Sequence, residues 1–210
     1  VMWSLRGHRQ EPHGIGSTRA ELPSNGIPSM RLFLDTEWAV QPDQGVELVS
    51  LGLVSEDEQY VFYAECDPLP PEAPDFVHVA VYPLLQRGEF AKEQTQLAEA
   101  LRDFISEVSK ADGEPPVICY DFPMDAHLFK EAWGGLGGEA ACATAAEVRW
   151  YSLNALAPHY GSGVERYFSA NPEASARRHH ALVDARAARA GFLYAMRMGA
   201  GSGRCSDGST

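Results

Sequence analysis

Residues 31–40 read R-L-F-L-D-T-E-W-A-V, and the architecture of the chain can be worked out from them. Residues 31–34 are typical of a buried strand, and Asp35 and Glu37 follow where such a strand reaches the edge of a sheet. Side chains two residues apart lie on the same side of a strand. Two neighbouring carboxylates repel each other unless a positive charge lies between them. Taken alone, the motif is explained equally well by two ordinary acids at a solvent-facing strand end.

The apolar pattern after this segment predicts two more strands and then alternating helices and strands. Residues 46–54 and 59–65 are strand-like and are separated by the acidic turn S-E-D-E, which favours an antiparallel meander. The later predicted elements are a helix over 90–110, a strand over 116–120, a helix over 123–133, a short helix over 152–157 capped by Ser152 and closed by Pro158 and Gly161, and a last helix over about 180–198. This order predicts an α/β domain in which helices cover a mixed sheet.

Length and composition agree with one domain. The chain has 210 residues, of which 45% are hydrophobic, enough for one buried core but short for two. Residues 1–29 mix Gly, Pro, Ser, Arg and His without a sustained period, and we interpret them as disordered or introduced by cloning, with Met30 as the natural start. Residues 199–210 are interpreted as a flexible tail. The domain is therefore expected to cover residues 30–198.

The formal net charge of −12 constrains the kind of partner that the chain can bind. Surfaces that follow nucleic-acid phosphates are usually basic, so the charge argues against a long duplex interface. A site built on four carboxylates supplies part of the negative excess, and two bound divalent cations would reverse its local sign. We therefore expect weak non-specific affinity and a small footprint, such as a strand end.

Several localisation signals are missing from the sequence. It has no run of about 18 apolar residues and no secretory signal pattern, so we expect no membrane association. Its four cysteines are widely spaced and form no C-x-x-C pair. Free thiols in a reducing cytoplasm are the favoured interpretation over disulfides or a zinc site.

A second acidic motif, Y-D-F-P-M-D-A-H-L-F, lies where the predicted strand 116–120 meets the helix 123–133. Asp125 enters the first turn of the helix, whereas Asp121 occupies the turn before it. We prefer Asp125 as the functional acid, because the apolar Leu128 and Phe129 fix its orientation against the core. An ordinary acid at a helix N-terminus, favoured by the helix dipole, is the alternative interpretation.

The third motif, H-H-A-L-V-D-A-R, opens the last predicted helix. His179 precedes Asp184 by five residues, which is about 500° of helical rotation, so the two cannot share a helix face. They can converge if His179 lies in a loop, and the Ser/Ala/Arg-rich stretch from Ala174 suits a loop. A helix with a polar first turn is the alternative. His180 is interpreted as a surface residue or a satisfied core histidine.

In this order, D-T-E, a strand-to-helix Asp and H-x4-D resemble the motifs of the DEDDh exonucleases, the superfamily of ribonuclease T, oligoribonuclease and polymerase proofreading subunits. The resemblance covers residues 30–195. Within that group the chain looks most like the small bacterial 3'-5' exoribonucleases first recognised in mycobacteria. It departs from the usual motifs in two places. Asp121 and Met124 replace the Asn and Phe of an Asn-x-x-Phe-Asp motif, and Val183 replaces the acid before the final Asp.

The resemblance implies a ribonuclease H-like fold with a five-stranded mixed sheet flanked by helices. It also implies two Mg2+ or Mn2+ ions held by Asp35, Glu37, Asp125 and Asp184, with His179 as the general base. Carboxylate ligands suit these hard cations better than zinc. Hydrolysis of phosphodiester bonds is the implied activity.

Substrate contacts are expected from Thr36, Trp38 and Arg178, with Arg149 and Arg177 as further candidates for phosphate contacts. Trp38 can stack on a terminal base, and an aromatic plug at a strand end explains it equally well. The resemblance implies an RNA 3' end, single-stranded or overhanging, as substrate, with DNA as an alternative, and a homodimer. A nucleotide phosphohydrolase and an inactive nucleic-acid-binding module are the other function classes considered.

Overall fold

The structure, a computed structural model, describes residues 29–41, 45–134 and 148–201. The expected disordered N-terminal segment lies outside these residues except for Ser29, and the expected tail lies outside them except for residues 199–201. Among the described residues, no helix is both long and apolar enough to cross a membrane. Cys66 and Cys119 are free thiols, while the other two cysteines lie outside the described ranges.

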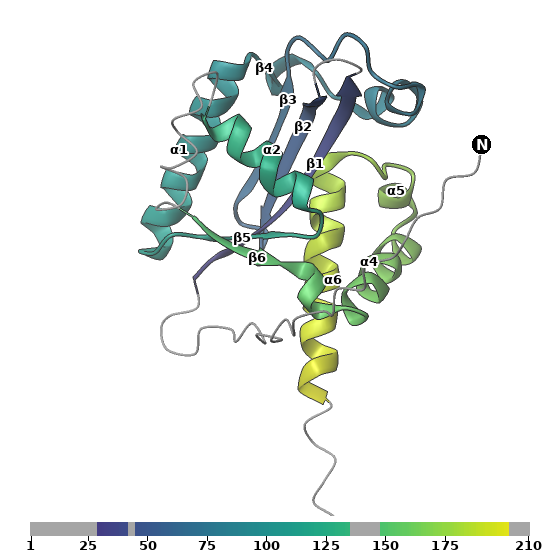
Figure 1. Cartoon of the computed structure of the whole chain (residues 1–210). Helices are drawn as coiled ribbons and strands as arrows, with labels where there is room; N and C mark the ends of the chain where they lie inside the picture. The colour runs from purple at the N-terminus through teal and green to yellow at the C-terminus, as the bar shows by residue number, and fades with distance from the viewer. Residues whose placement is uncertain (1–28, 42–44, 135–147, 202–210) are drawn as a thin grey trace, which may run out of the picture.

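A mixed sheet forms the centre of the domain, with strand order β4-β3-β2-β1-β5-β6 (Figure 1). The long strands β1 (Arg31–Gln41) and β2 (Gly45–Ser55) pair antiparallel, and β3 (Val61–Cys66) extends the meander predicted from the sequence. Strands β5 (Val117–Tyr120) and β6 (Arg149–Ser152) continue the sheet in parallel on the other side of β1. The mixed α/β sheet is confirmed.

The sheet has six strands, one more than expected. Neither β4 nor β6 was located from the sequence, and β4 (Ala91–Lys92) is two residues long and pairs with the end of β3. Residues 91–92 therefore lie in the sheet, and the helix predicted from residue 90 begins later, as α1 (Gln94–Asp112). A capping box at its first turn fixes this start, because the side chains of Glu93 and Gln96 each accept a hydrogen bond from the other residue's backbone N–H.

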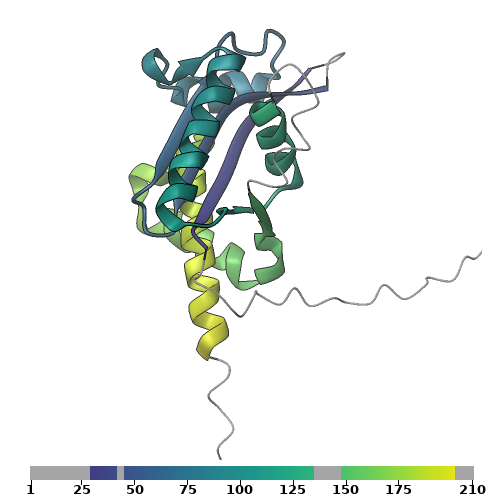
Figure 2. The same ribbon diagram turned by 90° about the vertical axis from the view of Figure 1, so that its left-hand side faces the viewer.

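Helices cover both faces of the sheet (Figures 1 and 2). Helices α1 and α2 (Pro123–Gly134) pack on one face, where Leu32 and Leu34 of β1 join their core. On the other face, Phe33 packs against α6 (Ala181–Gly201) and α4 (His159–Ala170). The alternation of β1 side chains therefore directs Asp35, two residues after Phe33, toward the α6 face.

The prediction that Pro158 and Gly161 close a helix over 152–157 is wrong, because α4 begins at His159. The preceding element is a 3-10 helix, Leu153–Leu156, from which the Ser152 side chain accepts no capping hydrogen bond, and α4 continues through Gly161. Helices α4 and α6 approach closely at glycines. A Cβ on Gly163 would lie 2.8 Å from the Cα of Gly191. Their contact outweighs the weak helix propensity of glycine.

The start of α6 lies directly against β2 at Gly52. A Cβ on Gly52 would lie 2.5 Å from the backbone nitrogen of Leu182 and 2.6 Å from the carbonyl carbon of Ala181. Since Gly52 also pairs with Asp35 on β1, this glycine sets the distance between Asp35 and the first turn of α6.

We expect Gly52→Ala to lower the free energy of unfolding by about 1–3 kcal/mol, because backbone atoms of α6 must move to admit the methyl group. Urea unfolding followed by circular dichroism measures the change. Gly161→Ala in α4 is the matched control, since nothing lies within 4 Å of its added Cβ. The control is expected to stabilise by about 0.5–1 kcal/mol through helix propensity. Equal stabilities of the two variants would contradict the close approach of β2 and α6.

Candidate metal centre

A cavity of about 340 Å³ lies where β1, the β5–α2 turn and the loop before α6 meet. Its walls also include Phe76 and Val77, at the start of the short π-helix Val77–Val81. The cavity is lined by all five residues predicted to be catalytic: Asp35, Glu37, Asp125, His179 and Asp184. Asp121, the alternative to Asp125, lines it as well.

The lining side chains form two groups whose ligand atoms suit a metal ion. Asp35, Asp121 and Asp125 form one group, and Glu37, His179 and Asp184 form the other. Within each group, one potential ligand atom per residue lies within 4.8 Å of the others. Three distant segments of the chain thus supply two clusters to one cavity, and the aspartate cluster is consistent with divalent metal binding.

Asp125 is fixed by hydrogen bonds from two directions. Its Oδ1 accepts bonds from the Thr36 hydroxyl at 2.7 Å and the Thr36 backbone N–H at 3.3 Å, while Oδ2 accepts from the Phe122 backbone N–H at 3.3 Å. Asp125 is 2% exposed. Its carboxyl group connects the start of α2 to β1. Thr36, expected to bind substrate, also lines the cavity but donates its hydroxyl to Asp125.

Asp121 is held by an element absent from the sequence-based prediction. Its Oδ2 accepts a hydrogen bond from Tyr160 of α4 at 2.9 Å, and its backbone carbonyl accepts one from the Asn154 side chain. Asp121 and Asp125 therefore both stand beside Asp35, in the same ligand group. The choice of Asp125 over Asp121 stays a prediction.

His179 lies in the loop before α6, the position that its spacing from Asp184 requires. Its backbone has a φ of 72°, in the left-handed region that few residues other than glycine adopt. The backbone N–H of His179 donates to Asp184 Oδ2 at 2.9 Å. The edge of its ring meets Phe76, with centroids 5.0 Å apart. The histidine and the aspartate are thus joined through the backbone, and the imidazole remains exposed to the cavity.

Burial and mutual repulsion make the carboxylates strong acceptors for protons or cations. Desolvation, followed by the neighbouring acids, raises the pKa of Asp35 well above its usual range and that of Glu37 to about 8. Desolvation likewise raises the pKa of Asp125 to about 7 and that of Asp184 to about 6. No Lys or Arg is among the described residues that line the cavity.

Two buried carboxylate oxygens, Asp35 Oδ2 and Asp184 Oδ1, have no hydrogen-bond partner among the described residues. A divalent cation would supply both the missing partner and the missing positive charge. The residues present therefore fit a hard metal ion. Desolvation and the nearby Arg178 lower the pKa of His179, which keeps its imidazole neutral at physiological pH.

Aromatic side chains stand at the mouth of the cavity. Trp38, expected to contact substrate, stacks on Phe122 with a centroid distance of 6.4 Å and an interplanar angle of 7°. Phe122 and Phe76 are 54% and 57% exposed although they are large and apolar. Neither phenylalanine was predicted as a site residue, and the sequence signal for Phe122 is its position directly after Asp121.

The candidate phosphate-binding arginines do not line the cavity. Arg178 forms an ion pair with Glu165 at 2.7 Å, and its guanidinium lies over the ring of Phe168. The Arg149 guanidinium donates to Ser29 and to the carbonyl of Pro115 at the far end of β5. Their roles in substrate binding stay predictions, as does that of the exposed Arg177.

Comparison with known proteins identifies the fold. No protein-family model and no curated protein matches the sequence. Among solved structures, the chain is similar to exonuclease I, with a TM-score of 0.55 and 16% sequence identity. The match covers 81% of this chain and 41% of exonuclease I, so the chain spans less than half the length of that protein. The likeness agrees with a ribonuclease H-like fold, the fold expected from the sequence motifs.

The raised carboxyl pKa values predict how metal and pH together affect stability. A carboxyl whose pKa is higher in the folded than in the unfolded chain holds its proton more tightly when folded, so it reduces stability as pH rises from about 4 to about 8. In EDTA, we therefore expect the Tm to fall from pH 5.5 to pH 8. Mn2+ at about 100 times its Kd should raise the Tm by about 5–10 °C at pH 8 and by less at pH 5.5.

Differential scanning fluorimetry with EDTA, Mg2+ and Mn2+ across this pH range checks the prediction. Asp35→Asn removes one of the repelling charges and one ligand, so it should flatten the pH dependence and reduce the metal shift. A metal shift equal in the wild-type chain and in Asp35→Asn would contradict the proposed ligand set.

Proposed function

We propose that this chain is a metal-dependent 3'-5' exonuclease that removes nucleotides from RNA 3' ends or overhangs. The observation that carries the proposal is the pair of adjacent ligand groups in one cavity, Asp35/Asp121/Asp125 and Glu37/His179/Asp184. The likeness in fold to exonuclease I supports it, as does the order of the acidic motifs along the chain. The choice of RNA is supported by the resemblance of these motifs to those of small bacterial exoribonucleases.

Cleavage of a phosphodiester requires stabilisation of the charge on the attacking oxygen and on the departing oxygen. The anionic diester repels hydroxide, and the departing oxygen is a poor leaving group. Two divalent ions, when bound, would stabilise the charge on both oxygens. Asp35, Glu37 and Asp184 are proposed to hold one ion and Asp35 with Asp125 the other. Asp35 suits a shared role, because desolvation and then the charges of Asp125, Asp184, Glu37 and Asp121 all raise its pKa.

His179 is proposed to accept the proton of the attacking water. Its ring is neutral at physiological pH and accessible from the cavity. The bond from its backbone N–H to Asp184 keeps the imidazole beside the carboxylates. A neutral imidazole can accept a proton from water, as general base catalysis requires.

The mouth of the cavity is suited to a single strand end. The half-buried Trp38 and the exposed Phe122 offer an aromatic surface on which an unpaired base can stack, a contact worth about 1–3 kcal/mol. The lack of basic residues among those described at the cavity agrees with a short footprint on the phosphate backbone. The homodimer expected from the resemblance can be measured by analytical ultracentrifugation.

We expect the full chain with Mg2+ or Mn2+ to shorten a 5'-labelled RNA with a 3' overhang one nucleotide at a time, and EDTA to stop the reaction. Asp35→Asn and Asp125→Asn should each lower the rate by at least about 100-fold, because each removes a proposed ligand. Asp121→Asn, whose carboxylate already accepts a bond from Tyr160, should reduce it less. Denaturing gel electrophoresis resolves the products.

The same assay separates the alternatives. The all-deoxy oligonucleotide tests DNA as substrate, and free nucleotides test a phosphohydrolase. A chain that binds the RNA without shortening it would be a binding module. Undiminished activity of Asp35→Asn would refute the metal mechanism.

For His179→Ala, we expect kcat to fall by about 100- to 10,000-fold while the Mn2+ affinity changes by less than about threefold, since a general base acts mainly in the transition state. Single-turnover kinetics and calorimetric metal titration measure the two quantities. His127→Ala is the matched control, because His127 lies exposed on α2 and pairs with Glu131. Equal losses of turnover and metal affinity would mean that His179 is a ligand or a structural residue.

A further inference from the structure

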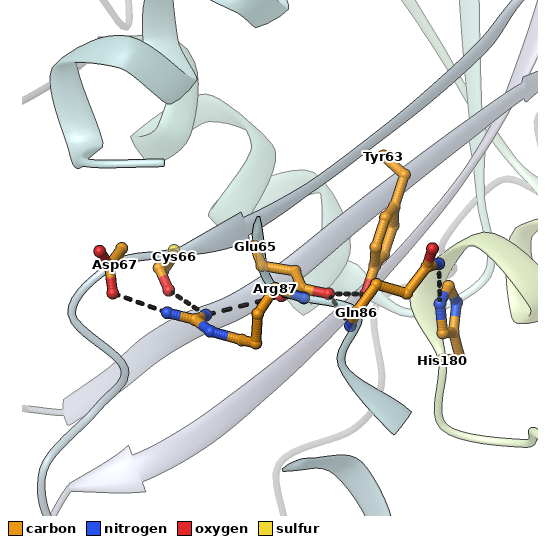
Figure 3. A network of polar contacts seen from close by, with 7 residues as sticks. All are labelled: Tyr63, Glu65, Cys66, Asp67, Gln86, Arg87 and His180. Atoms are coloured by element: carbon orange, nitrogen blue, oxygen red, sulfur yellow. Dashed lines mark hydrogen bonds and ion pairs between the residues drawn. The ribbon is translucent and has the colours of Figure 1, made fainter. Parts of the chain in front are cut away.

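A buried carboxylate outside the cavity holds a polar network that leads to the loop before α6 (Figure 3). Glu65 of β3 is 0% exposed. Its Oε1 accepts bonds from the Tyr63 hydroxyl at 2.8 Å and the Gln86 backbone N–H at 2.6 Å, and its Oε2 accepts from the Arg87 backbone N–H at 2.9 Å. The Arg87 guanidinium lies 3.5 Å from Oε2 and supplies the opposite charge. Glu65 therefore fixes the backbone of residues 86–87 against the sheet.

The network continues from Gln86 and Tyr63 to His180. The side-chain nitrogen of Gln86 lies 3.0 Å from His180 Nε2. An amide nitrogen can only donate, so the ring nitrogen accepts. The other side of the contact is apolar, since the His180 ring stacks on Tyr63 with centroids 4.5 Å apart and an interplanar angle of 18°. Gln86 and Tyr63, which both bond to Glu65, thus hold the His180 ring. His180 is 2% exposed.

His180 in turn holds the first turn of α6. Its backbone carbonyl accepts hydrogen bonds from the N–H groups of Val183 at 2.8 Å and Asp184 at 3.0 Å. His179 comes directly before it, with the left-handed φ of 72°. A residue other than glycine keeps such a conformation only where the surrounding structure enforces it. The His180 ring, which Gln86 and Tyr63 contact, belongs to the next residue in the chain.

We propose that Glu65, Gln86, Tyr63 and His180 form a clamp that positions His179 and Asp184 for the reaction. These are positioning residues, since none of them lines the cavity. The role rests on the function proposed above, whereas the clamp itself is a property of the fold. The alternative is a purely structural role, in which the Glu65–Arg87 pair only fastens residues 86–87 to the sheet. In that case the contact between Gln86 and His180 would have no effect on His179.

Two substitutions remove the link with little change in packing. Gln86→Ala deletes the donor at an exposed position, and His180→Phe keeps a ring to stack on Tyr63 but lacks the acceptor nitrogen. Gln59→Ala is the matched control, because Gln59 is an exposed glutamine in the turn between β2 and β3. The thermal unfolding of each variant shows that it remains folded.

The first readout is hydrogen exchange, measured by NMR, of the backbone N–H groups of His179, Val183 and Asp184 in the full chain. Both substitutions should speed this exchange by about tenfold, the scale of one lost hydrogen bond, whereas Gln59→Ala should not. The double variant Gln86→Ala/His180→Phe should exchange no faster than either single variant, because both delete the same contact. Unchanged exchange would overturn the clamp, whether or not the chain is a nuclease.

The second readout is the split between kcat and KM on the RNA substrate. Misplacing the base affects the chemical step more than binding, so Gln86→Ala should lower kcat by about tenfold and leave KM within about twofold. Faster exchange with unchanged kcat would overturn the positioning role. A wild-type chain without nuclease activity would refute the proposed function alone, and the exchange data would still decide whether the clamp exists.

Discussion

The mutual repulsion of buried carboxylates is the constraint on which the arrangement of this domain depends. Asp35, Glu37, Asp121, Asp125 and Asp184 share one cavity, and the described residues that line it include no Lys or Arg. Such a cluster is unfavourable in the folded chain unless the acids are protonated or a cation binds. The structure responds by holding several carboxylates with hydrogen bonds from Thr36, Tyr160 and the His179 backbone. Asp35 Oδ2 and Asp184 Oδ1 have no hydrogen-bond partner within the described part of the chain, which is consistent with binding of a divalent cation.

The close approach of α6 to the sheet determines where the last of these acids stands. Gly52, the pairing partner of Asp35, lets the backbone at residues 181–182 come into contact with β2. Gly163 and Gly191 do the same between α4 and α6, which brings Tyr160 of α4 to Asp121. Glycine is used at these points because there is no space for a Cβ. The distance between the two ligand groups therefore depends on backbone packing between elements far apart in sequence.

The two adjacent histidines have opposite environments. His179 faces the cavity with its ring exposed, and its pKa is lowered by desolvation and by Arg178. His180 is buried between Tyr63 and Gln86, and burial lowers its pKa to about 4, so that it stays neutral. The proposed general-base role of His179 requires an ordered loop. The contacts of the buried His180 lie directly next to that residue in the chain.

By itself, the sequence determined the elements with clear periodicity: the β1–β3 meander, the helices α1, α2 and α6 within a few residues, and the mixed α/β class. It also placed Asp35, Glu37 and Asp184 by local rules, since strand alternation and helix pitch fix relative directions within a segment. Strand β6 and helix α4 were missed, because β6 is a short strand and α4 contains glycines that only its packing on α6 explains. The positions of Asp121, Phe76, Phe122 and the Glu65 network depend on contacts between residues far apart in sequence. Only the tertiary structure decides those contacts, because no local periodicity records which distant segments meet.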